Sequence, residues 1–139
     1  MTLSTEDRLQ IEQLLNLHGH LCDAGAFDRF TEIFTDDVRY DTTAVGGEVL
    51  IGPGGGRDAA LALGDKNPVA HLISNIVIGN ESDDGVEVVS KGLGLRTSGE
   101  LGCVVYQDRL VRTADGWRIA SRVITPRSAP LQPYPLPAF

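Results

Sequence analysis

The fold is decided by residues 101–125, which read LGCVVYQDRLVRTADGWRIASRVIT. The stretch contains two runs rich in valine, isoleucine and other strand-forming residues, separated by Ala114-Asp115-Gly116. A short turn of this kind joins antiparallel neighbours. We therefore expect a hairpin of two strands, Leu101–Thr113 and Trp117–Thr125, with Trp117 packed in the core.

Two further strands are expected before this hairpin. Val69–Asn80 and Val86–Thr97 lie on either side of the turn Asp83-Asp84-Gly85, and Gly92 and Gly94 indicate a bend in the second of them. Four consecutive strands joined by short turns predict an antiparallel meander.

The N-terminal part of the chain has helical patterns. Apolar residues recur at spacings of three and four along Thr5–Asp23, which predicts a long helix. Ser4 is a suitable N-cap, and Gly25 can end the helix in a left-handed conformation. Two shorter helices are expected over Phe27–Phe34 and Arg57–Leu63.

The region between the two short helices is expected to be extended. Val38–Asp41 and Glu48–Ile51 have strand character, and the glycine-rich Gly52–Gly56 follows them. A glycine-rich stretch before a helix can bind phosphate, but this one lacks the spacing of the known phosphate loops, so we expect a plain turn. Helices followed by a curved meander predict an α+β cone over residues 1–125, with three N-terminal helices packed on a mainly antiparallel sheet.

The last segment, Pro126–Phe139, contains five of the seven prolines. Proline excludes it from a helix or a central strand. Three arrangements are open: a semi-extended tail over the surface, a lid over the mouth of a cavity, or an arm across a second copy of the chain.

Composition excludes several classes of function. The 139 residues fit one domain, and the net charge of −7 argues against nucleic acid or anionic membranes as partners. The chain has no apolar run of 18 residues, and its polar, acidic N-terminus is not a signal peptide, so we expect a cytoplasmic protein. Cys22 and Cys103 are isolated and are expected to be buried, reduced thiols. His18 and His20 lie two apart, so the three histidines do not predict a metal site.

One strand face carries a candidate pocket. Alternation along Val69–Asn80 places His71, Ile73, Asn75 and Val77 on the same face. Two polar groups among apolar ones are typical of a small-molecule pocket. A buried structural histidine is the alternative interpretation of His71.

Asp23 is the candidate partner of His71. It ends the first helix, where the helix dipole disfavours a carboxylate, so a protonatable side chain is needed to compensate it. If the fold brings the two together, the carboxylate holds the imidazole in one tautomer and supports the imidazolium that forms when it takes a proton. This pair predicts a general base; the alternative is a solvated aspartate.

Two more side chains share this region. Arg122 alternates with Ala120 and Ile124 on one sheet face, although arginine on a strand is usually a surface residue. His18 lies on the apolar stripe of the first helix, as a satisfied core histidine or as a second polar group of the pocket. Arg96, beside the strand glycines, is a further candidate for binding substrate.

Several segments carry a family resemblance. They are the first helix, CDAGAFDRFTEIFTDDVRYD at 22–41, AHLISNIVI at 70–78 and RLVRTADGWRIASR at 109–122. Together they resemble the SnoaL-like branch of the nuclear transport factor 2-like superfamily. The resemblance implies a cone-shaped α+β fold around a small-molecule cavity. Its members include dehydratases, isomerases, cyclases, epoxide hydrolases and proteins that are not enzymes.

Two members of the superfamily make the expectation more specific. In scytalone dehydratase and in hexachlorocyclohexane dehydrochlorinase, an aspartate ends the first helix and a histidine lies early in the first meander strand, as Asp23 and His71 do here. Asn75 and Arg122 match the dehydrochlorinase, whose lysine on the first helix is replaced by His18. The resemblance implies that Arg122 stabilises a leaving group or an oxyanion by charge-assisted hydrogen bonds.

A rival assignment rests on Tyr40-Asp41. Ketosteroid isomerase, in the same superfamily, has its proton-shuttling aspartate in a comparable segment, after a DD-containing turn and before a glycine-rich stretch. In this alternative Asp41 is the base and Tyr40 points the other way.

These observations favour a cofactor-independent lyase or isomerase. We expect proton abstraction, in a dehydration, elimination or isomerisation, from an apolar oxygenated or polyketide-like small molecule. The alternatives are a polyketide cyclase, including a pericyclic one, that uses mainly the shape of the pocket, and a ligand-binding module without catalysis. The resemblance also implies a homo-oligomer, a dimer or a trimer.

Overall fold

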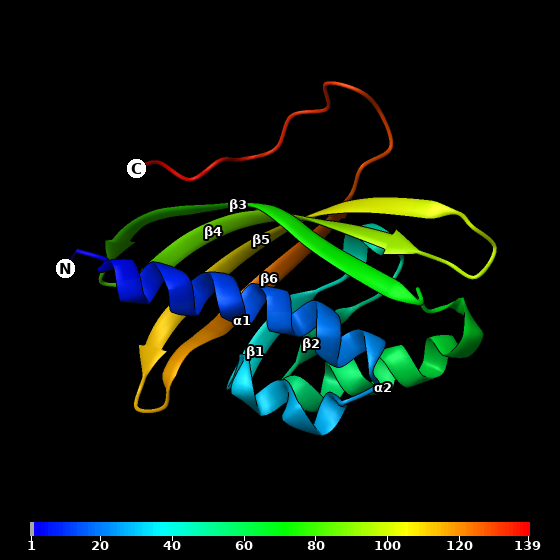
Figure 1. Ribbon diagram of the computed structural model, residues 1–139, viewed down its shortest axis with the longest axis horizontal. Helices are drawn as coiled ribbons and strands as arrows, with labels where there is room; N and C mark the ends of the chain where they lie inside the picture. The colour runs from blue at the N-terminus through cyan, green and yellow to red at the C-terminus, as the bar shows by residue number, and fades with distance from the viewer. Residues whose placement is uncertain (1) are drawn as a thin grey trace.

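Six strands form one mixed sheet in the computed structural model, which describes residues 2–139 (Figure 1). The strands are β1 Phe34–Asp41, β2 Val49–Ile51, β3 Ala70–Ser82, β4 Gly85–Leu95, β5 Leu101–Thr113 and β6 Gly116–Pro126. Their order is β2-β1-β6-β5-β4-β3; β1 and β6 are parallel and all other neighbours are antiparallel. The predicted meander and the predicted α+β class are confirmed.

The helices pack on one face of this sheet (Figure 1). They are α1 Thr5–Asp23 and α2 Pro53–Leu63, with the short 3-10 helices η1 Phe27–Glu32, η2 Thr43–Val45 and η3 Gly64–Lys66. In the described part of the chain, no helix is long and apolar enough to cross a membrane.

Local sequence signals place α1 where it was predicted. The Ser4 hydroxyl accepts a hydrogen bond from the Asp7 backbone N–H, and the Asp7 carboxylate accepts one from the Ser4 N–H, which forms a capping box. Beyond the last turn, Gly25 has a φ of +63°. One face of α1 is buried against the sheet: Ile11, Leu14, Leu15, His18, Gly19 and Leu21.

The predicted helix over Phe27–Phe34 is partly wrong. Its first part forms η1, but Phe34 begins β1, which continues through Asp36 and Asp37 to Asp41. Tertiary pairing outweighs the local pattern here, because the Ile119 backbone N–H donates to the Ile33 carbonyl at 2.8 Å.

The prediction of a turn at Gly52–Gly56 is also wrong. Gly52, with a φ of +78°, precedes Pro53, which is the first residue of α2. Proline is well suited to this position because its missing N–H would have no helical partner. The helix packs against η1 at Gly56, where a Cβ would touch the Phe30 ring at 3.4 Å.

The core lies between α1 and the inner face of the sheet. Trp117 is buried in it, 3% exposed, as predicted. The other apolar side chains of this core that are no more than 3% exposed are Ile11, Leu15, Leu21, Phe30, Ile33, Phe34, Val38, Val86, Val88, Leu110 and Ile119.

The C-terminal segment runs along the other side of the sheet from α1 (Figure 1). The Asn80 N–H donates to the Ala138 carbonyl at 3.2 Å, and the Gln107 side chain donates to the Pro135 carbonyl at 3.4 Å. Arg127 also lies over the Tyr134 ring. The tail therefore covers the outer face of the sheet, and it is not a lid over the helix side.

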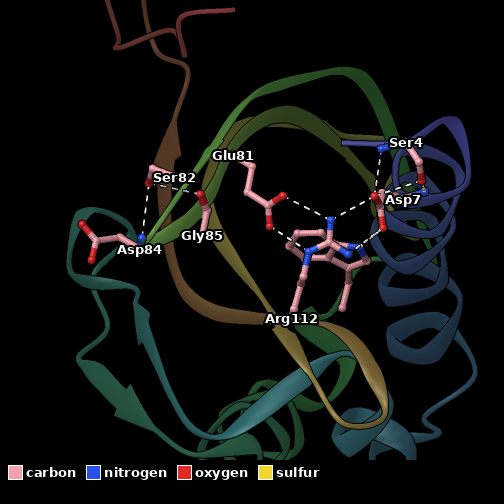
Figure 2. A network of polar contacts seen from close by, with 8 residues as sticks. Ser4, Asp7, Glu81, Ser82, Asp84, Gly85 and Arg112 are labelled. Atoms are coloured by element: carbon pink, nitrogen blue, oxygen red, sulfur yellow. Dashed lines mark hydrogen bonds and ion pairs between the residues drawn. The ribbon is translucent and has the colours of Figure 1, made fainter. Parts of the chain in front are cut away.

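Arg112 joins three elements at one end of the molecule (Figure 2). Its guanidinium donates to both carboxylate oxygens of Asp7 on α1, at 3.0 and 2.9 Å, and to both of Glu81 on β3, at 2.8 and 3.1 Å. It also stacks on Trp117, 4.5 Å from the ring centroid, and the indole N–H donates to Asp7. The hydrogen bonds from Arg112 hold the pKa of Asp7 and of Glu81 below their usual ranges.

Replacing Arg112 by methionine should change how stability depends on acid. Because both carboxyl pKa values are depressed in the folded state, their contribution is present above about pH 4.5 and is lost as the pH falls. In Arg112→Met this contribution is smaller. The variant should therefore be less stable at pH 7, and its unfolding free energy should fall less than that of the wild type between pH 5 and pH 3. Urea unfolding over that range measures both effects. Arg96→Met, which breaks an exposed pair with Glu100, is the matched control. If the unfolding free energy depends on pH equally in wild type and Arg112→Met, this expectation is contradicted.

Candidate functional site

A cavity of about 180 Å³ opens between α1, α2 and the inner face of the sheet. Its walls are mainly apolar and aromatic, with a few polar groups. The lining residues are His18, Cys22, Phe27, Phe30, Tyr40, Thr42, Leu50, Gly56, Ala59, Ala60, Leu63, Asn67, His71, Tyr106 and Ile124. This combination is typical of a small-molecule site.

The structure brings Asp23 and His71 together at this cavity. Asp23 is the last residue of α1, and His71 is the second residue of β3. The His71 Nδ1 lies 2.6 Å from Asp23 Oδ1, and the His71 backbone N–H donates to Asp23 Oδ2 at 3.0 Å. The His71 side chain is 20% exposed and the Asp23 side chain is 25% exposed, so the pair is neither fully buried in the core nor open to bulk water.

This geometry decides which nitrogen of His71 is free. A carboxylate only accepts hydrogen bonds, so Nδ1 carries the proton that it donates to Asp23. The lone pair of the neutral ring is then on Nε2, and the side chain lines the cavity. The arrangement can take a proton from a bound molecule and stabilise the resulting imidazolium.

Gly19 allows α1 to come close enough for this contact. A Cβ at Gly19 would lie 3.1 Å from the His71 carbonyl oxygen and 3.4 Å from Ile73 Cγ1. Gly19 is one helical turn before Asp23, so the spacing between α1 and β3 at Gly19 helps to set the position of the carboxylate.

Gly19→Val should therefore separate Asp23 from His71 although it changes neither residue. The added bulk meets the backbone carbonyl of His71, so α1 and β3 must move apart to make room, and we expect a loss of about 1–3 kcal/mol in unfolding free energy. Urea unfolding and the Asp23–His71 distance in a crystal structure of the variant measure the two effects. Gly54→Ala, where a Cβ would meet nothing within 4 Å, is the control. An unchanged distance in Gly19→Val would show that the contact does not depend on this close approach.

Three buried polar side chains are joined by hydrogen bonds and extend from the cavity wall into the protein. Arg122 Nε and Nη2 donate to the two carboxylate oxygens of Asp108 at 2.7 and 2.8 Å. Arg122 Nη1 lies 3.2 Å from His18 Nδ1. All three are almost fully buried: His18 4%, Asp108 4% and Arg122 1% exposed. Burial and the charge of Arg122 hold the pKa of His18 well below its usual value, so this ring stays neutral.

Two tyrosines form part of the cavity wall. Burial raises the pKa of Tyr40 and of Tyr106, so both are neutral phenols. Arg122 lies over the Tyr106 ring, 4.2 Å from its centroid. Gly92 makes room for this ring, because a Cβ there would lie 2.5 Å from Tyr106 Cε2.

The predicted direct role of Arg122 needs correction. Arg122 shares the inner sheet face, as expected, but it does not line the cavity, and three of its five N–H groups are directed at Asp108 and His18. The structure therefore places the guanidinium behind the cavity wall, in contact with His18. Its neighbour His18 does line the cavity.

Three other predicted site residues lie outside the cavity. Asp41 bonds to the backbone and hydroxyl of Thr43, while Tyr40 faces the cavity, which is the reverse of the rival assignment. Arg96 is exposed and pairs with Glu100. Asn75 is exposed with a φ of +54°, because an irregularity in the β3–β4 register interrupts the alternation on which its placement depended.

Sequence reasoning missed Tyr106 and Asp108. The alternation of Val104, Tyr106 and Asp108 along β5 was available as a signal for both. Both cysteines are free and only partly buried, and burial raises the pKa of the Cys22 thiol to about 11. Among residues 2–139, no three histidine, cysteine, aspartate or glutamate side chains are grouped so that they could hold a metal ion.

Comparison with known proteins identifies the family. The model of the SnoaL-like domain matches residues 4–123. The chain belongs to the SnoaL-like family. An uncharacterized protein of Mycobacterium tuberculosis strain H37Rv is 32% identical to this SnoaL-like protein over 124 residues, which cover 86% of this chain and 84% of that protein.

Solved structures agree on the fold of this SnoaL-like protein. LinA has a TM-score of 0.72 at 22% identity, with 96% of this chain and 100% of that chain covered. A provisionally named scytalone dehydratase of Novosphingobium aromaticivorans has a TM-score of 0.71 at 17% identity, with 97% of each chain covered. A protein of Nostoc punctiforme with a cystatin-like fold has a TM-score of 0.76 at 20% identity, with 95% and 100% covered. The NTF2-like fold suggested by the sequence is confirmed.

Proposed function

We propose that this SnoaL-like protein is an enzyme that removes a proton from carbon in a small, apolar, oxygenated molecule. The observation that carries the proposal is the 2.6 Å contact between Asp23 and His71 at the rim of an apolar cavity. A provisionally named scytalone dehydratase among the structural neighbours supports the same class of reaction.

In this mechanism His71 Nε2 takes the proton from a C–H group that is acidified by a neighbouring carbonyl. Asp23 accepts the Nδ1–H and stabilises the imidazolium, and its second oxygen holds the His71 backbone. The C–H electron pair moves to the carbonyl oxygen and forms an enolate. The neutral donors of the cavity stabilise that oxygen.

Two outcomes are open to the enolate. In a dehydration it expels a hydroxyl group from the next carbon, which leaves as water with the proton from His71. In an isomerisation His71 returns the proton to a different carbon. Neither the dehydration nor the isomerisation needs an oxidant, a reductant or a co-reactant. The same residues can therefore serve a lyase or an isomerase.

The size and lining of the cavity limit the substrate. Its volume of about 180 Å³ is below the range of roughly 300–1,000 Å³ that is usual for drug-sized ligands. The apolar and aromatic walls favour a ring or a short branched chain over a strongly charged molecule. We therefore propose a small cyclic or aromatic ketone as the substrate class.

Product analysis on a defined panel tests this function. The purified protein is incubated with small cyclic β-hydroxyketones and β,γ-unsaturated ketones, and the products are identified by chromatography and mass spectrometry. Conversion of at least one compound, lost in His71→Gln and kept in Asp41→Asn, supports the proposal. Asp41 is a suitable control because its carboxylate lies outside the cavity.

The same panel tests the ligand-binding alternative. A compound that is only bound raises the melting temperature and is recovered unchanged. Binding without conversion across the panel, with equal behaviour of wild type and His71→Gln, would favour a binding module and contradict the enzyme.

A further inference from the structure

The buried Asp108–Arg122 pair ends on a third side chain that does face the cavity. Asp108 occupies Arg122 Nε and Nη2, and the guanidinium directs Nη1 at His18 Nδ1, 3.2 Å away. Of the three side chains Asp108, Arg122 and His18, only His18 lines the cavity.

The contact with Arg122 fixes where the proton of His18 is. A guanidinium has donors and no acceptor, so His18 Nδ1 must accept. A neutral imidazole carries one N–H, which is therefore on Nε2. The ring cannot turn freely, because Phe30 stacks on it at 6.0 Å and Phe34 and Tyr106 contact it edge-on at 5.9 and 6.0 Å.

The Nε2–H of His18 has only a weak partner in the protein. Among residues 2–139 this is the Cys22 Sγ at 3.6 Å, and Cys22 also lines the cavity. Thiol sulfur is a weak acceptor. A buried donor gains more from an oxygen atom, so this position is suited to a ligand oxygen.

We infer that His18, held in its Nε2–H tautomer by the Asp108–Arg122 pair, donates a hydrogen bond to the carbonyl oxygen of the substrate. Arg122 and Asp108 are then positioning residues, and His18 is the residue that selects for a neutral oxygen. This inference rests on the proposed function, because it assigns the oxygen that becomes the enolate when His71 removes the proton.

The inference predicts discrimination between ligands that differ only in this oxygen. Acetophenone and α-methylstyrene have the same shape, but the second has a CH₂ group in place of the carbonyl oxygen. Acetophenone accepts the hydrogen bond from His18, and α-methylstyrene leaves that donor without a partner. The two ligands should therefore have different effects on the His18 ring.

Nitrogen NMR of protein labelled with ¹⁵N-histidine tests the inference without any turnover. Protonated and unprotonated ring nitrogens resonate far apart, and His18→Gln identifies the His18 signals. We expect His18 to have its proton on Nε2 alone, and acetophenone but not α-methylstyrene to shift that signal. The exposed His20 is the internal control. A proton on Nδ1, or no difference between the two ligands at His18, would overturn the inference.

Asp108→Asn tests the positioning role. The amide keeps the shape but weakens the hold on Arg122, so we expect a mixed His18 tautomer and a kcat/KM about 100-fold lower on any converted ketone. If Asp108→Asn does not fold, the wild-type spectra still decide the inference. A folded Asp108→Asn protein with an unchanged tautomer and unchanged kcat/KM would contradict the positioning role. Correct His18 spectra without turnover would reject the proposed function alone.

Discussion

Replacing His71 by glutamine should lower kcat by about 10²–10⁴-fold, which is the usual contribution of a general base. Glutamine has no basic nitrogen to take the proton, and neither of the other histidines can replace it. His18 is buried and neutral, and its ring lone pair accepts the hydrogen bond from Arg122. His20 does not line the cavity. Steady-state kinetics on a ketone converted by the wild type measures the effect.

The fold should survive this substitution. His71 lies at the rim of the cavity, and its backbone N–H, which bonds to Asp23 Oδ2, is still present in the variant. Circular dichroism and the melting temperature should stay close to those of the wild type. Asp23→Asn should also lose activity, because an amide does not stabilise an imidazolium as a carboxylate does. Full activity in either variant would remove the base from the account.

Breaking the buried ion pair should have the largest effect on stability. Asp108 and Arg122 are fully buried side chains joined by two hydrogen bonds of 2.7 and 2.8 Å. Arg122→Met leaves the Asp108 carboxylate buried without its counter-charge, so we expect a loss of about 3–5 kcal/mol in unfolding free energy. Urea unfolding at pH 7 measures it.

A double variant distinguishes the loss of the ion pair itself from the cost of leaving the Asp108 carboxylate buried alone. Arg122→Met combined with Asp108→Leu removes both charges, and we expect it to recover most of the lost stability. Arg29→Met, which breaks an exposed pair with Glu32, should change stability little. A loss in Arg122→Met no larger than in Arg29→Met would show that the buried pair is not important for folding.

The parts of the fold that were predictable carry their information locally. The capping residues Ser4 and Asp7 and the regular apolar spacing define α1, and turn sequences define both ends of β5. By contrast, β1 exists because Phe34 pairs with Ile119, a contact between residues far apart in the chain. Local pattern cannot show such a pairing, and the predicted helix there was too long.

The candidate site shows the same limit. Period-two alternation placed His71 on the inner face, but the irregular pairing after Ser74 reversed the pattern before Asn75. The resemblance to known families pointed to Arg122 as a pocket residue. Only the register of β5 and β6, which sets Asp108 opposite Arg122, shows that the guanidinium is already neutralised.

Solvent deuterium exchange tests the central claim most directly, because it detects removal of a proton from carbon whatever reaction follows. The wild type, His71→Gln and Asp41→Asn are incubated in D₂O with a ketone that the protein binds, and mass spectrometry follows deuterium entering the carbon next to the carbonyl. The account predicts incorporation with wild type and Asp41→Asn and only the uncatalysed background with His71→Gln. Equal incorporation with wild type and His71→Gln, or none above background with any of the three proteins, would contradict it.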